Sequence, residues 1–285
     1  MKDHPLPFPE KQESLLASVV IHLESLNAGS LLPETGRKVH GFWHEHWKRI
    51  CPPAAESLHP NNGKAEFTLS PIFGLPQPEN DVIRLSPGMP AWFRVTTLRP
   101  TLTEALFNEH NGWLITLPAE LDFGPIRWKP SFQPFSKIDA AWSWLCSYEA
   151  MRRAAQPSVS WKISLSTPTS FSGRYVDFTF PLPELLVKSW LERWNHFAPP
   201  ALGLPEELID AAREHLRVTE YHLSTCPGER QTIGCRGSLV IQAYHLPPEA
   251  RTQLDLLFLY AYYCGSGHRT AQGMGQTRLL RRWSG

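Results

Sequence analysis

The sequence has little of what a disulfide-stabilised, metal-binding or membrane-spanning protein needs. Its 285 residues include five cysteines, an odd number, and no two of them form a CxxC pair. Neither a disulfide framework nor a thiolate zinc site is therefore indicated, which fits a reducing compartment. The longest apolar stretch, residues 254–264, contains Asp255 and is too short to span a bilayer. The first residues lack the apolar core of a secretion signal, so we expect a cytoplasmic protein without a membrane partner.

The sequence also lacks an excess of charge of either sign. Lys and Arg number 28 and Asp and Glu number 27, which gives a formal net charge of +1. A surface for nucleic acid must therefore be a local patch, because a chain that coats nucleic acid is basic throughout. Hydrophobic residues make up 42% of the chain, with 14 Phe and 11 Trp. This is enough core material for two domains and excludes a disordered protein.

The first half of the chain has the pattern of one mixed domain. Alternating apolar residues over 15–24 predict a strand, and helical spacing over 39–50 predicts a helix that ends before the proline pair at 52–53. We expect three further strands and a second helix, at residues 67–73, 92–98 and 113–117 and at residues 102–107. The order β-α-β-β-α-β is that of a ferredoxin-like domain, which we place at residues 1–139.

The second half has the pattern of another mixed domain. A clean alternation over residues 159–165 predicts a strand, and the later pattern predicts helices at 183–194, 205–216 and 248–263 with strands at 238–244 and at the end of the chain. We place this second domain at residues 140–285. The predicted fold class is therefore α+β, with two tandem ferredoxin-like (RRM-like) βαββαβ domains. Many unrelated functions use this fold, so it does not decide the function.

The most informative motif follows the last predicted helix. It reads CGSGHRTAQGMGQTRLLRR over residues 264–282, and two glycine pairs, Gly265/Gly267 and Gly273/Gly275, enclose a polar basic loop. Glycines let backbone N–H groups approach a ligand closely, and the positive charge comes from His268, Arg269, Arg278, Arg281 and Arg282. This combination favours binding of a phosphate backbone. A tight helix-to-strand turn that needs glycine only for its geometry is the alternative.

Two other segments accompany this glycine-rich loop. They are LHPNNGKAEFTLSPIFG at residues 58–74 and SLSTPTSFSGRYVDFTFPLPELLVKSWLERWN at residues 164–195. With GSGHRTAQGMG at residues 265–275, they resemble the CRISPR precursor-RNA-processing endoribonucleases. These enzymes belong to a wider superfamily of repeat-associated RNA-binding proteins with tandem ferredoxin-like domains. The resemblance covers nearly the whole chain, with the three motifs in the expected order.

The resemblance implies an endoribonuclease that needs neither a metal nor another cofactor. It would bind the repeat of a CRISPR transcript and cut once per repeat, through attack of a 2′-hydroxyl that leaves a 2′,3′-cyclic phosphate and a 5′-hydroxyl. The implied partner is repeat RNA, as precursor and as mature crRNA. Subunits of a CRISPR interference complex and a second copy of the chain are further candidate partners. A non-catalytic RNA-binding subunit of such a complex is the alternative function.

This chemistry needs a general base, a general acid and a cation that stabilises the developing charge. The resemblance points to His59 as the principal proton-transfer residue and to Lys64, before the FTLSP segment, for charge stabilisation. His40 and His44 are further catalytic candidates, since His44 stands near the position where relatives carry a catalytic tyrosine.

The first predicted helix carries these two histidines on one stripe with Arg37, which we assign to RNA binding along with the glycine-rich loop. A solvated polar edge of a core helix would have the same pattern. The i, i+4 spacing of His40 and His44 also suits zinc, but Gly41 stands where the zinc-protease pattern needs glutamate. His46 falls on the apolar face of the helix, so we expect it in the core.

Overall fold

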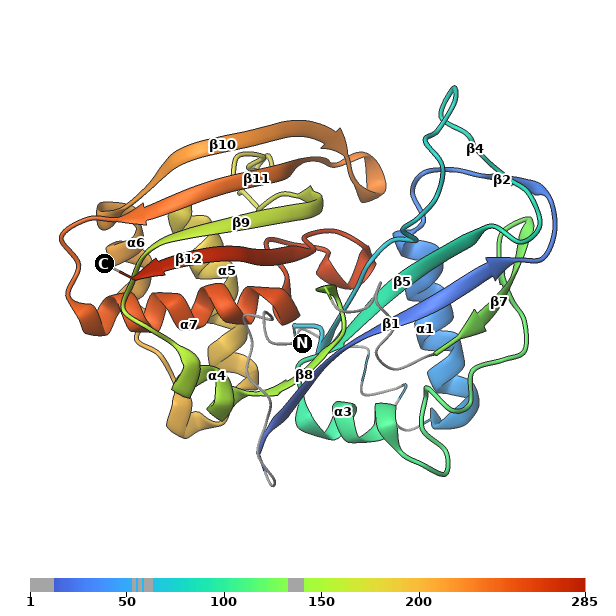
Figure 1. Ribbon diagram of the computed structural model, residues 1–285, viewed down its shortest axis with the longest axis horizontal. Coiled ribbons are helices and arrows are strands. Elements are labelled where there is room, and N and C mark those ends of the chain that lie inside the picture. The colour runs from blue at the N-terminus through green and yellow to red at the C-terminus, as the bar shows by residue number, and fades with distance from the viewer. Residues whose placement is uncertain (1–12, 53–54, 56–57, 59–63, 133–140, 285) are drawn as a thin grey trace. The chain divides into compact units, whose positions relative to one another are not determined.

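A computed structural model describes residues 13–52, 55, 58, 64–132 and 141–284 (Figure 1). The chain forms two compact units. The N-terminal unit consists of Ala17–Trp144 and Ala271–Gly273, and the C-terminal unit consists of Leu145–Thr270 and Met274–Gly285 with the residues up to Leu16. Among the described residues, no helix is both long and apolar enough to cross a membrane.

The N-terminal unit is built on an antiparallel sheet in the order β3-β5-β1-β7-β6, with β8 also paired to β1 and with β2 and β4 forming a separate ribbon. Its elements are β1 (Leu15–Ser25), β2 (Gly29–Leu31), α1 (Gly36–Ile50), β3 (Phe67–Leu69), β4 (Ile83–Leu85), β5 (Pro90–Thr97), α3 (Pro100–Phe107), β6 (Leu121–Phe123), β7 (Ile126–Ser131) and β8 (Trp144–Ser147). The strands β1, β3, β5 and β7 and the helices α1 and α3 follow the expected β-α-β-β-α-β order.

Aromatic side chains fix α1 on this sheet. Trp43 is fully buried, and its ring centroid lies 5.3 Å from that of Phe67 on β3 and 4.9 Å from that of Trp113. The predicted strand at residues 113–117 is wrong, because these residues form turns in which Thr116 N–H donates to the Gly112 carbonyl. The apolar pattern at this segment arises because Trp113 packs into the core from a loop. The fourth strand of the unit is β7 instead.

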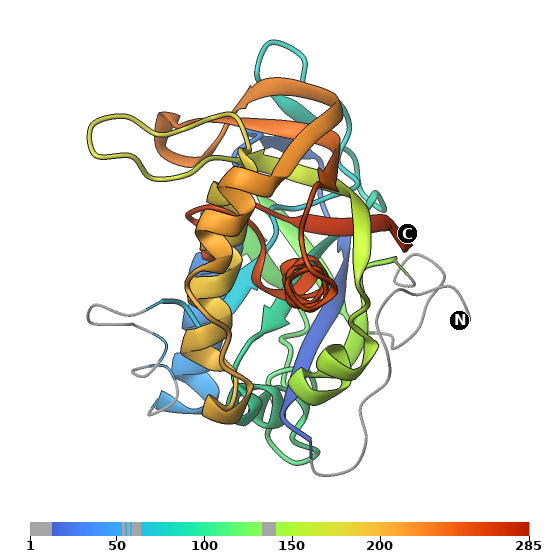
Figure 2. The same cartoon turned by 90° about the vertical axis from the view of Figure 1, so that its left-hand side faces the viewer.

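The C-terminal unit has a second antiparallel sheet, in the order β10-β11-β9-β12. Its elements are α4 (Tyr148–Ala154), β9 (Ser158–Thr169), α5 (Pro183–Phe197), η2 (Pro200–Leu202), α6 (Leu208–His215), β10 (Leu216–Pro227), η3 (Glu229–Gln231), β11 (Ile233–Ala243), α7 (Pro248–Cys264), η4 (Thr270–Gln272) and β12 (Thr277–Ser284). Residues of β9 alternate between buried and half-buried, so one face of the sheet is covered. The helices α5 and α7 lie on that covered face (Figure 2).

The expected α+β fold of two ferredoxin-like units is confirmed. The strand β10 was not predicted, because it lies at the sheet edge and most of its side chains are exposed. An edge strand without a buried face shows no alternating apolar pattern, so period-two analysis does not detect it.

One buried carboxylate joins three parts of the C-terminal unit. Asp255 on α7 is fully buried and accepts hydrogen bonds from Trp161 Nε1 on β9 at 2.7 Å and from Gln156 N–H at 2.9 Å. Arg282 on β12 donates to the same carboxylate at 2.5 Å. The apolar stretch at residues 254–264 is therefore a core helix, and its one charge is neutralised inside the unit.

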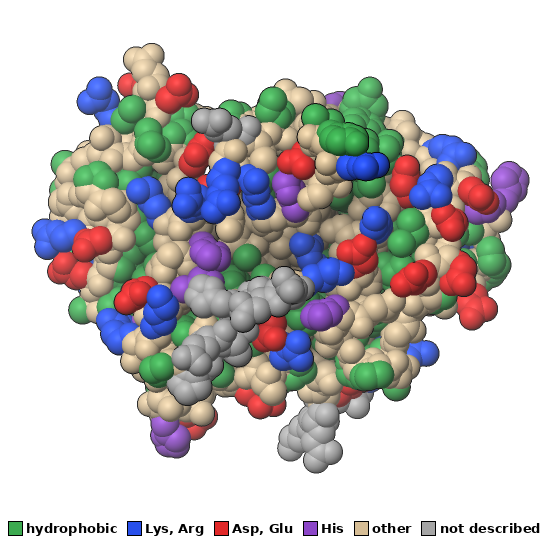
Figure 3. All heavy atoms as spheres, turned by 180° about the vertical axis from the view of Figure 1, so that it is seen from behind, with side chains coloured by type: hydrophobic (Ala, Val, Ile, Leu, Met, Phe, Trp, Pro, Cys, Tyr) green, Lys and Arg blue, Asp and Glu red, His purple; other side chains and the backbone are tan. Residues whose placement is uncertain are grey.

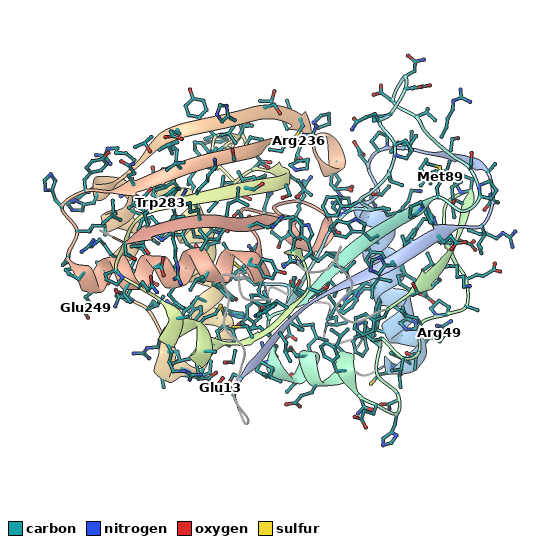
Figure 4. The ribbon with its side chains drawn as sticks, in the orientation of Figure 1. Glu13, Arg49, Met89, Arg236, Glu249 and Trp283 are labelled. Atoms are coloured by element: carbon teal, nitrogen blue, oxygen red, sulfur yellow. The ribbon has the colours of Figure 1, made fainter. Side chains whose placement is uncertain are left out.

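We expect Asp255→Ala to lower the free energy of unfolding by about 3–5 kcal/mol, because it leaves the Trp161 and Gln156 N–H donors without their acceptor and takes the counter-charge from half-buried Arg282. Urea denaturation followed by circular dichroism measures this loss. The matched control is Glu249→Ala at the exposed start of α7, labelled in Figure 4, with an expected change within about 0.5 kcal/mol. Equal effects of the two substitutions would contradict this account of Asp255.

Candidate functional site

Two histidines on α1 are in direct contact. The Nε2 atoms of His40 and His44 lie 3.2 Å apart, and the ring centroids lie 4.4 Å apart. His44 is 7% exposed and His40 is half-buried. One Nε2 must donate and the other accept, so the two neutral rings adopt complementary tautomers. When the pair takes up one additional proton, the two rings can share it across this contact. The pair can therefore hold and pass a proton.

Phe67, the first residue of β3, supports both rings. Its centroid is 5.6 Å from that of His44 and 6.3 Å from that of His40. Lys64 is half-buried and precedes Phe67 by three residues. The fold thus brings the two helix histidines next to the strand that follows Lys64. His59 lies outside the described residues, and Arg37 is exposed in the first turn of α1.

His46 is a core residue, as predicted. It is 2% exposed, and its Nε2 lies 3.1 Å from the Trp113 carbonyl oxygen while Arg49 donates to its Nδ1 at 2.8 Å. Burial lowers the pKa of His46 below its ordinary value. Where the chain is described, no three His, Cys, Asp or Glu side chains gather as a metal site would require.

The glycine-rich loop at residues 264–282 begins at the end of α7 and leads into β12. Its N–H groups are used inside the protein: those of Gly265, Ser266, His268, Met274 and Gly275 donate to backbone carbonyls, that of Gly267 donates to Ser189 Oγ, and that of Gln276 donates to Thr167 Oγ1. Gly265, Gly267 and Gly275 therefore use their N–H groups for hydrogen bonds inside the protein. These donors already have acceptors in the folded unit.

The glycines are needed for close packing. A Cβ on Gly267 would lie 2.1 Å from the Ser170 carbonyl oxygen, and one on Gly275 would lie 2.1 Å from that of Ser266. Both residues have positive φ, as do Gly265 and Gly273. Gly265, Gly273 and Gly275 are also buried. The turn geometry that the sequence left as an alternative thus accounts for the glycine pairs.

Arg193 on α5 holds the start of this loop. Its guanidinium donates to the carbonyl oxygens of Cys264 at 3.0 Å, Gly265 at 3.4 Å and Gly267 at 2.8 Å. Ser189, one helical turn earlier, accepts from Gly267 N–H at 2.9 Å. Sequence analysis did not find this contact, although the i, i+4 spacing of Ser189 and Arg193 in the SWLERW segment places both on one side of α5.

The side chains of the loop differ in their availability. Half-buried Arg269 has φ 54° and donates through one guanidinium nitrogen to the Glu229 carbonyl oxygen, and Arg278 on β12 is also half-buried. Arg282 is held by Asp255, so it supports the core. Burial lowers the pKa of His268, Asp177 raises it in part, and Arg269 and Arg193 lower it further.

We expect Arg193→Lys to loosen the loop, because an ammonium cannot reproduce the planar fork that bridges three carbonyl oxygens. Hydrogen–deuterium exchange of residues 264–277 should become faster, with a loss of about 1–3 kcal/mol in unfolding free energy. Arg213→Lys is the matched control, since Arg213 is 59% exposed and pairs only with a surface Asp210 one turn away among the contacts described. Unchanged exchange in the Arg193 variant would contradict the clamp.

Comparison with known proteins relates this geometry to a family. Residues 163–277, which run from within β9 through α5 and α7 to the start of β12, match the family model described as CRISPR-associated endoribonuclease Cas6. A CRISPR-associated endoribonuclease Cas6 of Streptococcus thermophilus is 27% identical over 123 residues, which is 42% of this chain and 50% of that protein. The chain thus matches about half the length of this curated relative.

Solved structures share the fold. The product complex of a Cas6 (TTHB231) has a TM-score of 0.73 at 22% identity, covering 94% of this chain and 100% of that chain. The substrate mimic complex of another Cas6 (TTHA0078) has a TM-score of 0.70 at 23% identity, covering 93% and 99%. The resemblance to the CRISPR-associated endoribonucleases is therefore confirmed, in sequence over residues 163–277 and in fold over nearly the whole chain.

Proposed function

We propose that this protein is an endoribonuclease that cleaves CRISPR precursor transcripts within the repeat and so produces mature crRNAs. The observation that carries the proposal is the match of residues 163–277 to the Cas6 endoribonuclease family, because this segment contains the clamped glycine-rich loop. The curated relative with the same activity in its name supports it. The histidine pair on α1 supplies proton-transfer groups of the type that such cleavage requires.

The proposed reaction needs no metal. The 2′-hydroxyl next to the scissile phosphate loses its proton to a general base, and its oxygen forms a bond to phosphorus. The bond between phosphorus and the 5′-oxygen breaks, and a general acid protonates this leaving oxygen. The products are a 2′,3′-cyclic phosphate and a 5′-hydroxyl. A cation beside the phosphorane lowers the barrier by stabilising its negative charge.

We assign proton transfer to His59 and to His40, whose half-buried ring can meet a substrate from solvent. Buried His44 sets the tautomer and orientation of His40 through their 3.2 Å Nε2–Nε2 contact and exchanges the proton with it. Lys64 stabilises charge, and Arg37 binds the RNA backbone at the exposed start of α1.

In the glycine-rich loop we assign RNA binding to side chains. His268, Arg269 and Arg278 are half-buried and therefore reach the surface. The four glycines Gly265, Gly267, Gly273 and Gly275 contribute by shaping the turn that carries these side chains. The loop would thus grip the RNA backbone through positive charge, in keeping with a chain whose overall charge is near zero.

We expect His59→Ala, His40→Ala and His44→Ala each to lower the single-turnover cleavage rate by about 10²- to 10⁴-fold in the presence of EDTA, since each removes a proton-transfer or proton-sharing group. Binding of repeat RNA with a 2′-deoxy scissile nucleotide should change by less than about 3-fold, because the lost groups act on the transition state. His110→Ala, at an exposed histidine after α3, is the control and should cleave normally.

The activities of these variants distinguish between the catalytic roles assigned to His59 and to the α1 histidines. Full activity of His59→Ala would move catalysis to the α1 pair, and full activity of both α1 variants would remove the pair from the mechanism. Mapping of the product ends tests the chemistry, because a 3′-hydroxyl end would contradict attack by the 2′-hydroxyl. Loss of wild-type cleavage in EDTA, restored by a divalent metal, would overturn metal independence. Tight RNA binding without any cleavage would favour the non-catalytic subunit.

We expect Arg269→Gln to weaken repeat binding and to reduce the slope of log Kd against log salt by roughly 0.7–0.9, the share of one phosphate contact. Fluorescence anisotropy across a salt series measures both quantities. Arg213→Gln removes the same charge from an exposed helix position away from the loop sequence and should leave the slope unchanged. If both variants shift the slope equally, Arg269 has no specific phosphate contact.

A further inference from the structure

The segment between β9 and α5 forms a small hairpin that stands away from its own sheet (Figure 2). Phe171 and Phe178 pair through two backbone hydrogen bonds, of 2.9 Å and 2.8 Å. The turn needs Gly173, because a Cβ there would lie 2.0 Å from the Val176 carbonyl oxygen. The hairpin Phe171–Phe178 is therefore a hydrogen-bonded element of the C-terminal unit, and its turn has a defined conformation.

The tip of the hairpin exposes large apolar side chains of a kind that folded proteins normally bury. Tyr175 is 84% exposed and Val176 is 75% exposed. Further large apolar side chains follow in or beside the hairpin, namely Phe178, Phe180, Leu182 and Tyr221. Figure 3 shows apolar side chains gathered next to Lys or Arg side chains on the face turned away from the view of Figure 1. Exposed apolar side chains that lie close to one another are typical of a contact surface.

The chemistry of the tip is aromatic and cationic. The guanidinium carbon of Arg174 lies 5.2 Å from the centroid of the Tyr175 ring, a cation–π contact. Arginine with an exposed aromatic ring is the combination that proteins use to bind unpaired nucleotides, since the ring stacks on a base and the guanidinium meets a phosphate. A protein partner of ordinary affinity needs a broad interface of about 800 Å² on each side, which a narrow tip does not offer.

The base of the hairpin is tied to the glycine-rich loop. His268 Nε2 lies 2.7 Å from Ser170 Oγ and 3.4 Å from Asp177 Oδ2, and its Nδ1 lies 3.4 Å from Ser172 Oγ. The N–H of His268 also donates to the Ser170 carbonyl at 3.1 Å. RNA held by Arg269, the next residue of the loop, would pass close to the hairpin.

We infer that the hairpin Phe171–Phe178 is a second RNA-binding element, in which Tyr175 stacks on an unpaired base and Arg174 contacts the neighbouring phosphate. The inference rests on the proposed function, because it takes the RNA from there. It adds a site for single-stranded nucleotides that is separate from the histidines of α1. Its specificity is for an unpaired nucleotide of any sequence, since every base has a face that stacks.

The test measures binding of the full chain to fluorescently labelled repeat RNA with a 2′-deoxy scissile nucleotide. We expect Tyr175→Ala to weaken binding about 5- to 100-fold, and Tyr175→Phe and Tyr175→Trp to restore it, because stacking needs a ring and no hydroxyl. The control is Tyr244→Ala, at a tyrosine that is 44% exposed and donates to Gln242. It should bind as the wild type does.

A second readout reports the contact directly. Repeat RNAs that each carry 4-thiouridine at a different position are crosslinked to the protein, and mass spectrometry identifies the modified residue. We expect a crosslink to Tyr175 from an unpaired position. Unchanged affinity of Tyr175→Ala together with no crosslink at the hairpin would overturn the inference while leaving the proposed function intact. If the wild type neither binds nor cuts repeat RNA, both fail. If Tyr175→Ala no longer bound a purified interference-complex subunit that the wild type binds, while its RNA affinity was unchanged, the tip would be a protein-docking site instead.

Discussion

The course of the glycine-rich loop depends on the contact between Arg193 and the end of α7. The guanidinium meets carbonyl oxygens of Cys264, Gly265 and Gly267, where the helix leaves acceptors without intrahelical partners and where its dipole is negative. A cation at this point both satisfies the oxygens and fixes the direction in which the chain leaves the helix. The positions of His268 and Arg269 follow from that direction.

The clamp also accounts for the internal hydrogen bonds that several backbone N–H groups of this glycine-rich loop make. The chain turns so tightly beside α5 that Gly267 and Gly275 have no room for a Cβ, and their N–H groups find acceptors inside the unit. Positive charge must then come from side chains on the outer side of the turn. In the proposed function, binding by the loop therefore depends on salt and on a few cations, although the chain as a whole carries a net charge of +1.

Sequence patterns predicted the parts that depend on local periodicity. The helices α1, α5 and α7 and the strand β9 each have a buried face, so their apolar spacing shows them. The i, i+4 spacing likewise predicted that His40 and His44 share one side of α1. The exposed edge strand β10 has no such face. The contact of Arg193 with Gly267 joins residues 74 apart in the chain, and single-sequence patterns carry no information on pairings at that separation.

Under the proposed function, histidine serves two purposes on the helix α1. His46 faces the core, where the Trp113 carbonyl and Arg49 fix its ring and burial disfavours its charged form. His44 is also buried, yet its Nε2 contacts the imidazole of His40, which is half-buried. In the proposed mechanism, a proton shared between His44 and His40 reaches the substrate through the half-buried His40 ring. Burial alone therefore does not separate the two proposed roles, and we base the assignment of His44 to proton transfer on the partner of its ring nitrogen.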